Sequence, residues 1–395
     1  MKRKIFKCFP GKLAVLLLLI ILVTPAWCFA EELEFTFQNS YDKTQQKAAA
    51  YIPEICKTQA KSPLLVIAHY MGGNRFTARN GGYYPECDSR GWLVVCPELH
   101  GRRTGGETSL ASLGAQHDII DSVNYMKLHY KVDAAKIYLD GRSMGGMMAG
   151  MMAAKYPDVF AAAMSGQGIS DLKLWWDTTI PSLRQSVEKE CGPWSEAVRF
   201  DYERRSSISY APNFQYVPFM LWHGTSDTWV PPEQSERLVA AIRTYNRFQP
   251  DANWLLCASH CPANYSPKWI CDQFTYYENI CEAGFQTPTR FFPELTIVTD
   301  EAKSFYWLGI TPLKDDAFAR VEAGLANGIL KVKTDNVKEI TINLDQISRL
   351  ITFTKYDINA KETIRLAIVK DGKTLFETTA GGRKSGTLPE TLFKK

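Results

Sequence analysis

Short apolar runs alternate with helix-like segments between residues 32 and 290. The runs are almost continuously apolar, as expected for parallel strands that are buried on both faces of a sheet. They cover residues 63–68, 91–96, 136–140, 159–164, 217–222 and 253–257, after an opening pair of strand-like runs at 33–37 and 47–52. Strand, helix and strand in this order predict an α/β fold, a mostly parallel sheet covered by helices on both sides.

From about residue 291 the pattern changes to short runs in which polar and apolar positions alternate, separated by Gly, Asp and Asn. This pattern predicts a small, sandwich-like all-β domain at 291–395. The runs cover residues 294–299, 304–310, 317–323, 328–334, 338–344, 349–354, 363–369 and 373–379. We find no catalytic constellation among them. A structural cap on the preceding domain is favoured, with a substrate- or surface-binding module as the alternative.

The N-terminus predicts export. A basic start is followed by the apolar stretch 13–23 and by the small residue Ala30, the arrangement of a secretory signal peptide. A retained N-terminal anchor is the alternative, but no later segment reaches the ~20 apolar residues of a membrane span. We therefore expect a signal peptide at 1–30, a mature chain from Glu31 that is secreted or periplasmic, and no stable membrane insertion.

Charge and length narrow the class further. The chain has 46 basic and 42 acidic residues, a net charge of +4, and no basic patch with interleaved aromatics, so the sequence does not predict nucleic-acid binding. Its 395 residues, 45% of them hydrophobic, are enough for two domains. We expect a catalytic domain at 31–290 and the β domain after it.

Eight of the ten cysteines remain after removal of residues 1–30. An even set in an exported chain predicts a disulfide framework, although the pairing cannot be deduced. We expect Cys257 and Cys261 to be disulfide-bonded, with Cys271 and Cys281 among the partners. Their irregular spacing does not suit zinc, and the sequence predicts neither a metal nor a cofactor.

The segment Gly141-Arg142-Ser143-Met144-Gly145 lies between a predicted strand and a predicted helix. This is the G-x-S-x-G pattern of a nucleophile elbow, in which the backbone lifts the serine hydroxyl clear of the sheet and the glycines prevent collisions. The helix that follows directs its first N–H groups toward a developing oxyanion, so Met144 is the expected donor.

A serine nucleophile needs a general base, and the base needs an acid that orients it. In sheets of this type the chain order is serine, acid, histidine. Asp227 follows the apolar run at 217–222, and His260 follows the run at 253–257. The remaining histidines precede Ser143 or stand beside the acid, so the order favours His260 as the base.

The chain contains the motifs "GRSMGG" and "HGTSDTWVPP" and a later histidine. Through these motifs it resembles the catalytic domain of the prolyl oligopeptidase family, in the α/β-hydrolase superfamily, over about residues 60–265. The resemblance implies that Ser143 is the nucleophile, Asp227 the acid and His260 the base. It also implies an oxyanion element in "AHYMGGNR", where Tyr70 would donate through its N–H or its phenol. An ordinary half-buried tyrosine is the alternative.

The chain departs from the family in two respects. It has no room for a propeller domain, and Ala258-Ser259 replace the usual Gly-Gly before the histidine. Small secreted relatives without the propeller often resemble carboxylesterases. We therefore expect a secreted serine hydrolase that cleaves small-molecule carboxylic esters, with a serine peptidase of the same mechanism as the alternative. A polyester depolymerase and a non-enzymatic binding scaffold are less favoured.

Residues 168–212 resemble a cap inserted over the site. We expect Trp175, Trp176 and Trp194 to line an aromatic pocket, although packing of the cap onto the body would equally explain them. Arg102 follows the fourth predicted strand and is expected to meet an acidic substrate, with a solvated surface arginine as the alternative.

Overall fold

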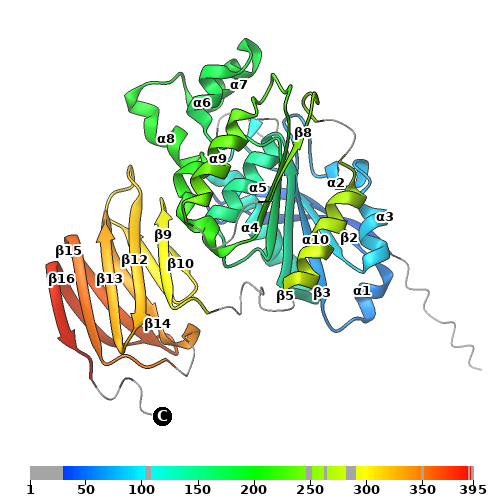
Figure 1. Ribbon diagram of the computed structural model, residues 1–395. Coiled ribbons are helices and arrows are strands. Elements are labelled where there is room, and N and C mark those ends of the chain that lie inside the picture. Colours follow the sequence, from blue (N-terminus) through cyan, green and yellow to red (C-terminus); the bar gives the residue numbers. More distant parts are fainter. Residues whose placement is uncertain are drawn as a thin grey trace, which may run out of the picture.

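The computed structural model describes residues 30–102, 108–245, 251–261, 265–281, 291–347, 351–389 and 392. The predicted signal peptide therefore lies outside the described residues, apart from Ala30. Two eight-stranded sheets follow one another along the chain (Figure 1). None of the described helices has the length and apolar character needed to cross a membrane.

The first sheet has the order β1-β2-β4-β3-β5-β6-β7-β8. Its strands are β1 (Glu31–Gln38), β2 (Gln45–Ile52), β3 (Ser62–Ala68), β4 (Leu93–Pro97), β5 (Val132–Arg142), β6 (Ala162–Gly166), β7 (Phe219–Gly224) and β8 (Asp251–Leu255). The opening hairpin pairs antiparallel with itself and with β4, and every other pairing is parallel. Strands β4, β6 and β7 are buried at every position, which confirms the expected α/β fold.

Two of the strand boundaries that differ from the prediction have a local cause in the backbone. The run at 159–164 begins with a turn, because the amides of Val159 and Phe160 donate to the Tyr156 carbonyl, so β6 starts later. At the end of β8 the backbone of Cys257 takes a φ of 56°, which is incompatible with an extended strand. The chain therefore leaves the sheet at Leu255, before the histidine loop.

Helices cover both faces of this sheet. One face is packed by α4 (Leu113–His129), α5 (Met144–Lys155) and α9 (Glu233–Arg243). The other is packed by α3 (Tyr83–Arg90) and α10 (Pro267–Cys281), which lie side by side in Figure 1. The short helices α1 (Glu54–Thr58) and α2 (Thr77–Asn80) precede and follow β3, and lie near the bottom and the top of this sheet in Figure 1.

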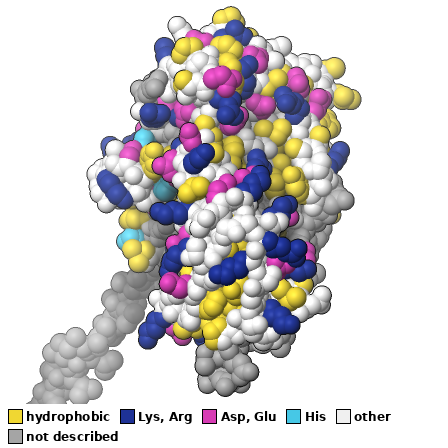
Figure 2. Space-filling view, turned by 90° about the vertical axis from the view of Figure 1, so that its left-hand side faces the viewer, with side chains coloured by type: hydrophobic (Ala, Val, Ile, Leu, Met, Phe, Trp, Pro, Cys, Tyr) yellow, Lys and Arg dark blue, Asp and Glu magenta, His cyan; other side chains and the backbone are white. Residues whose placement is uncertain are grey.

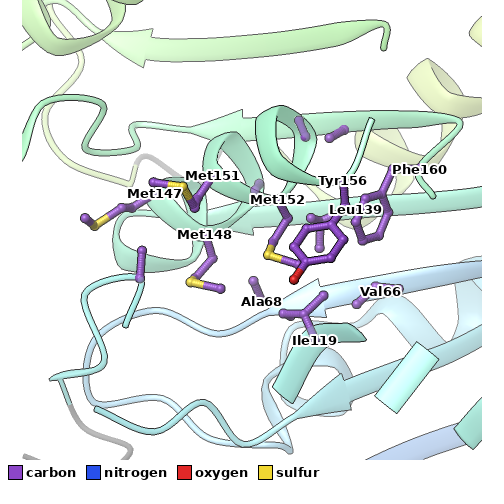
Figure 3. Close-up of a cluster of buried hydrophobic side chains, with 14 of the residues drawn as sticks. Val66, Ala68, Ile119, Leu139, Met147, Met148, Met151, Met152, Tyr156 and Phe160 are labelled. Carbon is purple, nitrogen blue, oxygen red and sulfur yellow. The ribbon is translucent and has the colours of Figure 1, made fainter. Parts of the chain in front are cut away.

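Helix α5 is buried along its whole length. Four of its five methionines, at 147, 148, 151 and 152, pack against residues of β3, β5 and α4 (Figure 3). Unbranched methionine side chains fill irregular gaps, and each buried one contributes about 1.5–3 kcal/mol by the hydrophobic effect. This packing holds in place the helix that begins directly after Ser143.

The segment between β6 and β7, which includes the predicted cap at 168–212, is helical. It contains α6 (Leu172–Thr178), α7 (Pro181–Cys191), η2 (Glu196–Val198), α8 (Arg199–Arg204) and η3 (Ser207–Tyr216). Buried Arg205 binds Glu190 at 3.0 Å and Asp201 at 3.2 Å, and thereby joins α7 to α8.

The second sheet forms the C-terminal all-β domain. Its strands are β9 (Glu294–Thr299), β10 (Lys303–Phe305), β11 (Leu308–Pro312), β12 (Ala319–Ala326), β13 (Ile329–Asp335), β14 (Val337–Asn343), β15 (Lys355–Lys370) and β16 (Lys373–Thr387), with the short η4 (Leu344–Gln346). Long β15 pairs parallel with both β13 and β14 and antiparallel with β16. The run at 349–354 was expected to be a strand, but its described residues 351–354 lie outside all strands. On the face shown in Figure 2, basic and acidic side chains are interspersed.

Buried charges join the two domains. Lys155, at the end of α5, lies 2.7 Å from Asp300 and 2.6 Å from Glu301, both just after β9. Arg204 binds the second oxygen of Asp300 at 2.7 Å. Asn213 donates to the carbonyls of Ala154 and Val298, and its side-chain oxygen accepts from the Val298 amide.

The expected disulfides are not formed among the described cysteines. Cys257 and Cys261 are exposed free thiols. Cys271, expected as a partner, is buried instead on α10, where it hydrogen-bonds with Cys87 of α3. The side chain of Cys281 lies outside the described residues. The disulfide prediction is thus corrected, because helix packing directs Cys271 away from the histidine loop.

Candidate active site

Ser143 occupies a sharp turn between β5 and α5, with φ 56° and ψ −121°. The adjacent glycines are required by close backbone approach. A Cβ at Gly141 would lie 2.2 Å from the Gly145 carbonyl oxygen, and one at Gly145 would lie 2.1 Å from the Ala68 oxygen. The Ser143 amide donates to the carbonyl of Gly166 at 2.8 Å, which ties the turn to the end of β6.

Three side chains from distant segments form a continuous hydrogen-bonded chain. The Ser143 Oγ lies 3.0 Å from His260 Nε2, and His260 Nδ1 lies 2.6 Å from Asp227 Oδ2. The other carboxylate oxygen accepts from the amides of Trp229 at 2.9 Å and Val230 at 3.0 Å. Because the carboxylate only accepts, Nδ1 carries the proton and Nε2 is left to accept from the hydroxyl.

The charges of this chain favour an ionised acid and a basic imidazole. Burial alone would raise the pKa of Asp227, but hydrogen bonds from His223, His260 and the Val230 amide hold that pKa well below its usual range. Burial alone would lower the pKa of His260, but its contacts with Asp227 and Cys261 raise the pKa to about 9. His223 itself is fully buried and bonded to Ser235 and the Val230 carbonyl.

The histidine loop is held by hydrogen bonds rather than by disulfides. The Cys257 amide donates to Thr225 Oγ1 at 2.9 Å, and the Ser226 amide donates to the Ala258 carbonyl at 2.9 Å. Gly224 permits this approach, since a Cβ there would lie 2.4 Å from the Ala258 oxygen.

A glutamine completes the arrangement. Gln167, directly after β6, contacts both Asp227 and the histidine loop. Gln167 was not predicted as a site residue, although its position at the carboxyl end of a predicted parallel strand was a usable signal.

The two expected oxyanion donors lie beside Ser143. Met144 is the first residue of α5, so its amide lies in the turn whose N–H groups have no intrahelical acceptor. Tyr70 lies in the turn after β3, where buried His69 accepts from the Leu99 amide at 3.0 Å and donates from Nδ1 to the Tyr70 carbonyl at 2.8 Å. Tyr70 itself is 49% exposed.

A cavity of about 370 Å³ opens beside Ser143 and His260. Its wall is largely apolar, and the side chains that make it so are Met71, Ile169, Trp175, Leu183 and Trp229. A second cavity of about 350 Å³ shares only Tyr70 and Arg142 with the first and is also lined by Tyr83 and Tyr265. Only the first cavity is lined by Ser143 and His260, so that cavity offers room for a substrate group beside the nucleophile.

The predicted pocket residues fall in different places. Trp175 is buried in the wall of the serine cavity, where its indole N–H donates to the Trp229 carbonyl at 2.7 Å. Trp176 and Trp194 do not line that cavity. Arg102 lines a separate cavity of about 420 Å³ beside His100. Within the described part of the chain, no group of three or more His, Cys, Asp or Glu residues is arranged to hold a metal ion.

The fold and this site define the class as a serine hydrolase with the α/β-hydrolase fold. The model of the prolyl oligopeptidase family matches residues 89–281, which confirms the resemblance seen in the motifs. A probable acetylxylan esterase A of Aspergillus flavus is 26% identical over 235 residues, 53% of this chain and 73% of that protein. A feruloyl esterase B of Thermothelomyces thermophilus is 26% identical over 237 residues, 54% and 75% of the two chains.

Solved structures support the fold. A Pyrococcus horikoshii acylaminoacyl peptidase aligns with a TM-score of 0.52 at 18% identity, covering 67% of this chain and 43% of its own. A puromycin hydrolase aligns with a TM-score of 0.54 at 21% identity, covering 66% and 41%. This chain thus spans less than half the length of either solved structure.

Proposed function

We propose that the protein hydrolyses carboxylic esters through an acyl-enzyme on Ser143, with His260 as general base and Asp227 as the acid that orients it. The observation that carries this proposal is the continuous chain of hydrogen bonds from the serine hydroxyl to the carboxylate, beside an open cavity. Nε2 of His260 accepts the hydroxyl proton as Oγ attacks the ester carbonyl, and later returns it to the leaving alkoxide. Water then cleaves the acyl-enzyme by the same route.

The Met144 amide and the Tyr70 segment are proposed to stabilise the oxyanion. The largely apolar cavity would take a hydrocarbon or aryl part of the ester. Two relatives named as acetylxylan and feruloyl esterases support an ester over an amide. The matched family leaves a peptidase as the second candidate. Export rests on the N-terminal pattern of residues 1–30 alone.

A fluorophosphonate probe tests the nucleophile. Ser143→Ala should abolish covalent labelling and lower kcat by roughly 10⁶-fold. Ser226→Ala, an exposed serine on the loop of the proposed acid, is the matched control and should label normally. Labelling that persists in Ser143→Ala would remove the assignment.

Substrate class is tested separately. The protein should hydrolyse short p-nitrophenyl esters with kcat/KM well above that for prolyl or alanyl anilides. Comparable values on the anilides would favour the peptidase.

A further inference from the structure

Gln167 is fully buried and has an uncommon backbone conformation for a residue other than glycine, with φ 48°. It stands one residue beyond β6, whose last carbonyl, that of Gly166, accepts from the Ser143 amide. Non-glycine residues at positive φ persist where surrounding contacts hold them, and such positions cluster at functional sites.

Both N–H groups and the oxygen of the Gln167 side-chain amide form hydrogen bonds. Its Nε2 donates to Asp227 Oδ2 at 2.8 Å and to the Ser259 carbonyl at 3.1 Å. Its Oε1 accepts from the Cys261 amide. The side chain therefore contacts the proposed acid and both neighbours of His260, on segments 60 and 92–94 residues away in the sequence.

The backbone that carries this amide has little freedom to shift. The backbone N–H of Gln167 donates to the Trp222 carbonyl of β7 at 2.8 Å. At the next residue, a Cβ on Gly168 would lie 2.3 Å from Ser165 Oγ and 2.5 Å from the Gly146 carbonyl carbon. The position of the amide is thus set by β6, β7 and the first turn of α5.

We propose that Gln167 is a positioning residue for catalysis, which holds the Asp227 carboxylate and the His260 loop in register with Ser143. This inference rests on the function proposed above. Gln167 does not touch the hydroxyl that reacts. It acts by fixing where the carboxylate and the imidazole lie, and catalytic rates are sensitive to misplacement of such groups by about 1 Å.

Gln167→Met tests this, because methionine has similar length but cannot form the three hydrogen bonds. We expect kcat to fall by roughly 10²-fold with KM nearly unchanged. Without the amide donor, Oδ2 of Asp227 binds the imidazolium more strongly, so the pH at which activity is half-maximal should move upward. Gln167→Glu places a second carboxylate beside Asp227 and should move that pH further in the same direction.

Gln234→Met is the matched control. Gln234 is also fully buried and also forms hydrogen bonds through both side-chain atoms, to Ser170 and Asp171, away from the triad. This variant should lose stability but keep the wild-type kcat and pH midpoint. A merely structural role for Gln167 would give the same result as this control.

The failure of this proposal is distinguishable from failure of the proposed function. Wild-type kcat and pH midpoint in Gln167→Met, or in Gln167→Glu if the first variant does not fold, would overturn the positioning role. Loss of probe labelling in Ser143→Ala alone would still support Ser143 as the nucleophile. If the wild-type protein itself neither labels nor cleaves esters, the proposed function fails first.

Discussion

The two sheets of this protein bury their side chains in different ways. In the first, β6 and β7 are buried at every position, whereas in the second, β12 and β13 alternate buried and exposed residues. The parallel strands of the first sheet end at a common edge, where loops from distant segments meet. Asp227 and His260 follow β7 and β8 there, beside the elbow after β5.

The β domain has no equivalent arrangement. All six histidines of the chain occur at or before residue 260, so the region after 291 contains no imidazole. Its alternating strands use one face for a core around Trp307 and Phe305 and expose the other. A sheet buried on both faces thus collects reactive side chains at its edge, whereas a sheet exposed on one face displays a broad polar surface.

The largest difference between the regions should come from neutralising one aspartate in each. Asp227→Asn should lower kcat by roughly 10⁴-fold, because an amide no longer holds His260 in the tautomer that accepts the serine proton. Asp357→Asn, on the exposed face of β15, removes the ion pair with Arg383 and should leave ester hydrolysis unchanged. Steady-state kinetics with matched far-UV CD spectra measure both. Near-wild-type activity in Asp227→Asn would contradict its role as the acid.

The contact between the regions should be the next most sensitive feature. Lys155→Met removes the buried cation shared by Asp300 and Glu301, leaves Asp300 with Arg204 alone, and should lower the free energy of unfolding by about 3 kcal/mol. Lys333→Met removes an exposed pair with Glu322 within the β domain and should cost no more than about 1 kcal/mol. Urea denaturation followed by tryptophan fluorescence measures the two values. Equal costs would mean that the buried network does not join the domains.

The pH dependence of activity should distinguish His260 from His100, two histidines of the first region. Since His260 must be neutral to accept a proton, kcat/KM should rise with pH through its pKa, which is raised to about 9. Burial would lower the pKa of His100, but Asp118 and Asp42 raise it to about 9 as well. His100→Gln should therefore leave the pH profile of activity unaltered.

The free energy of unfolding should fall as pH rises, whereas activity should increase. A histidine whose pKa is raised on folding contributes stability that is complete below about pH 6.5, the unfolded value, and is lost as pH rises toward about 9. His100→Gln should flatten this decline in thermal unfolding measured from pH 6 to 9. A steeper decline in the variant would contradict the assignment.

The smallest effect on activity is expected from treatment with a thiol reductant. Because hydrogen bonds hold the histidine loop, dithiothreitol should leave kcat within about two-fold of the untreated value. In the native protein, iodoacetamide should label Cys257 and Cys261, which are exposed, before the buried thiols of Cys87 and Cys271. Mass mapping that found either loop cysteine in a disulfide would restore the original prediction.

Local sequence determined the elements whose cause is local. Continuous and alternating apolar runs predicted the two kinds of sheet, because burial on two faces or one follows directly from side-chain direction. The G-x-S-x-G segment predicted the elbow, since its glycines are required by collisions within and beside the turn itself. The order of strand ends also selected Asp227 and His260, which do lie in hydrogen-bond reach of each other.

Tertiary structure alone decided the rest. Trp176 and Arg102 were expected in the pocket but face other surroundings, whereas Trp229 was not expected and lines it. The distances that matter there join segments separated by scores of residues, such as Gln167 and Ser259, 92 positions apart. No local spacing encodes such a contact, because it depends on how far each strand extends and at which residue each loop turns back over the sheet edge.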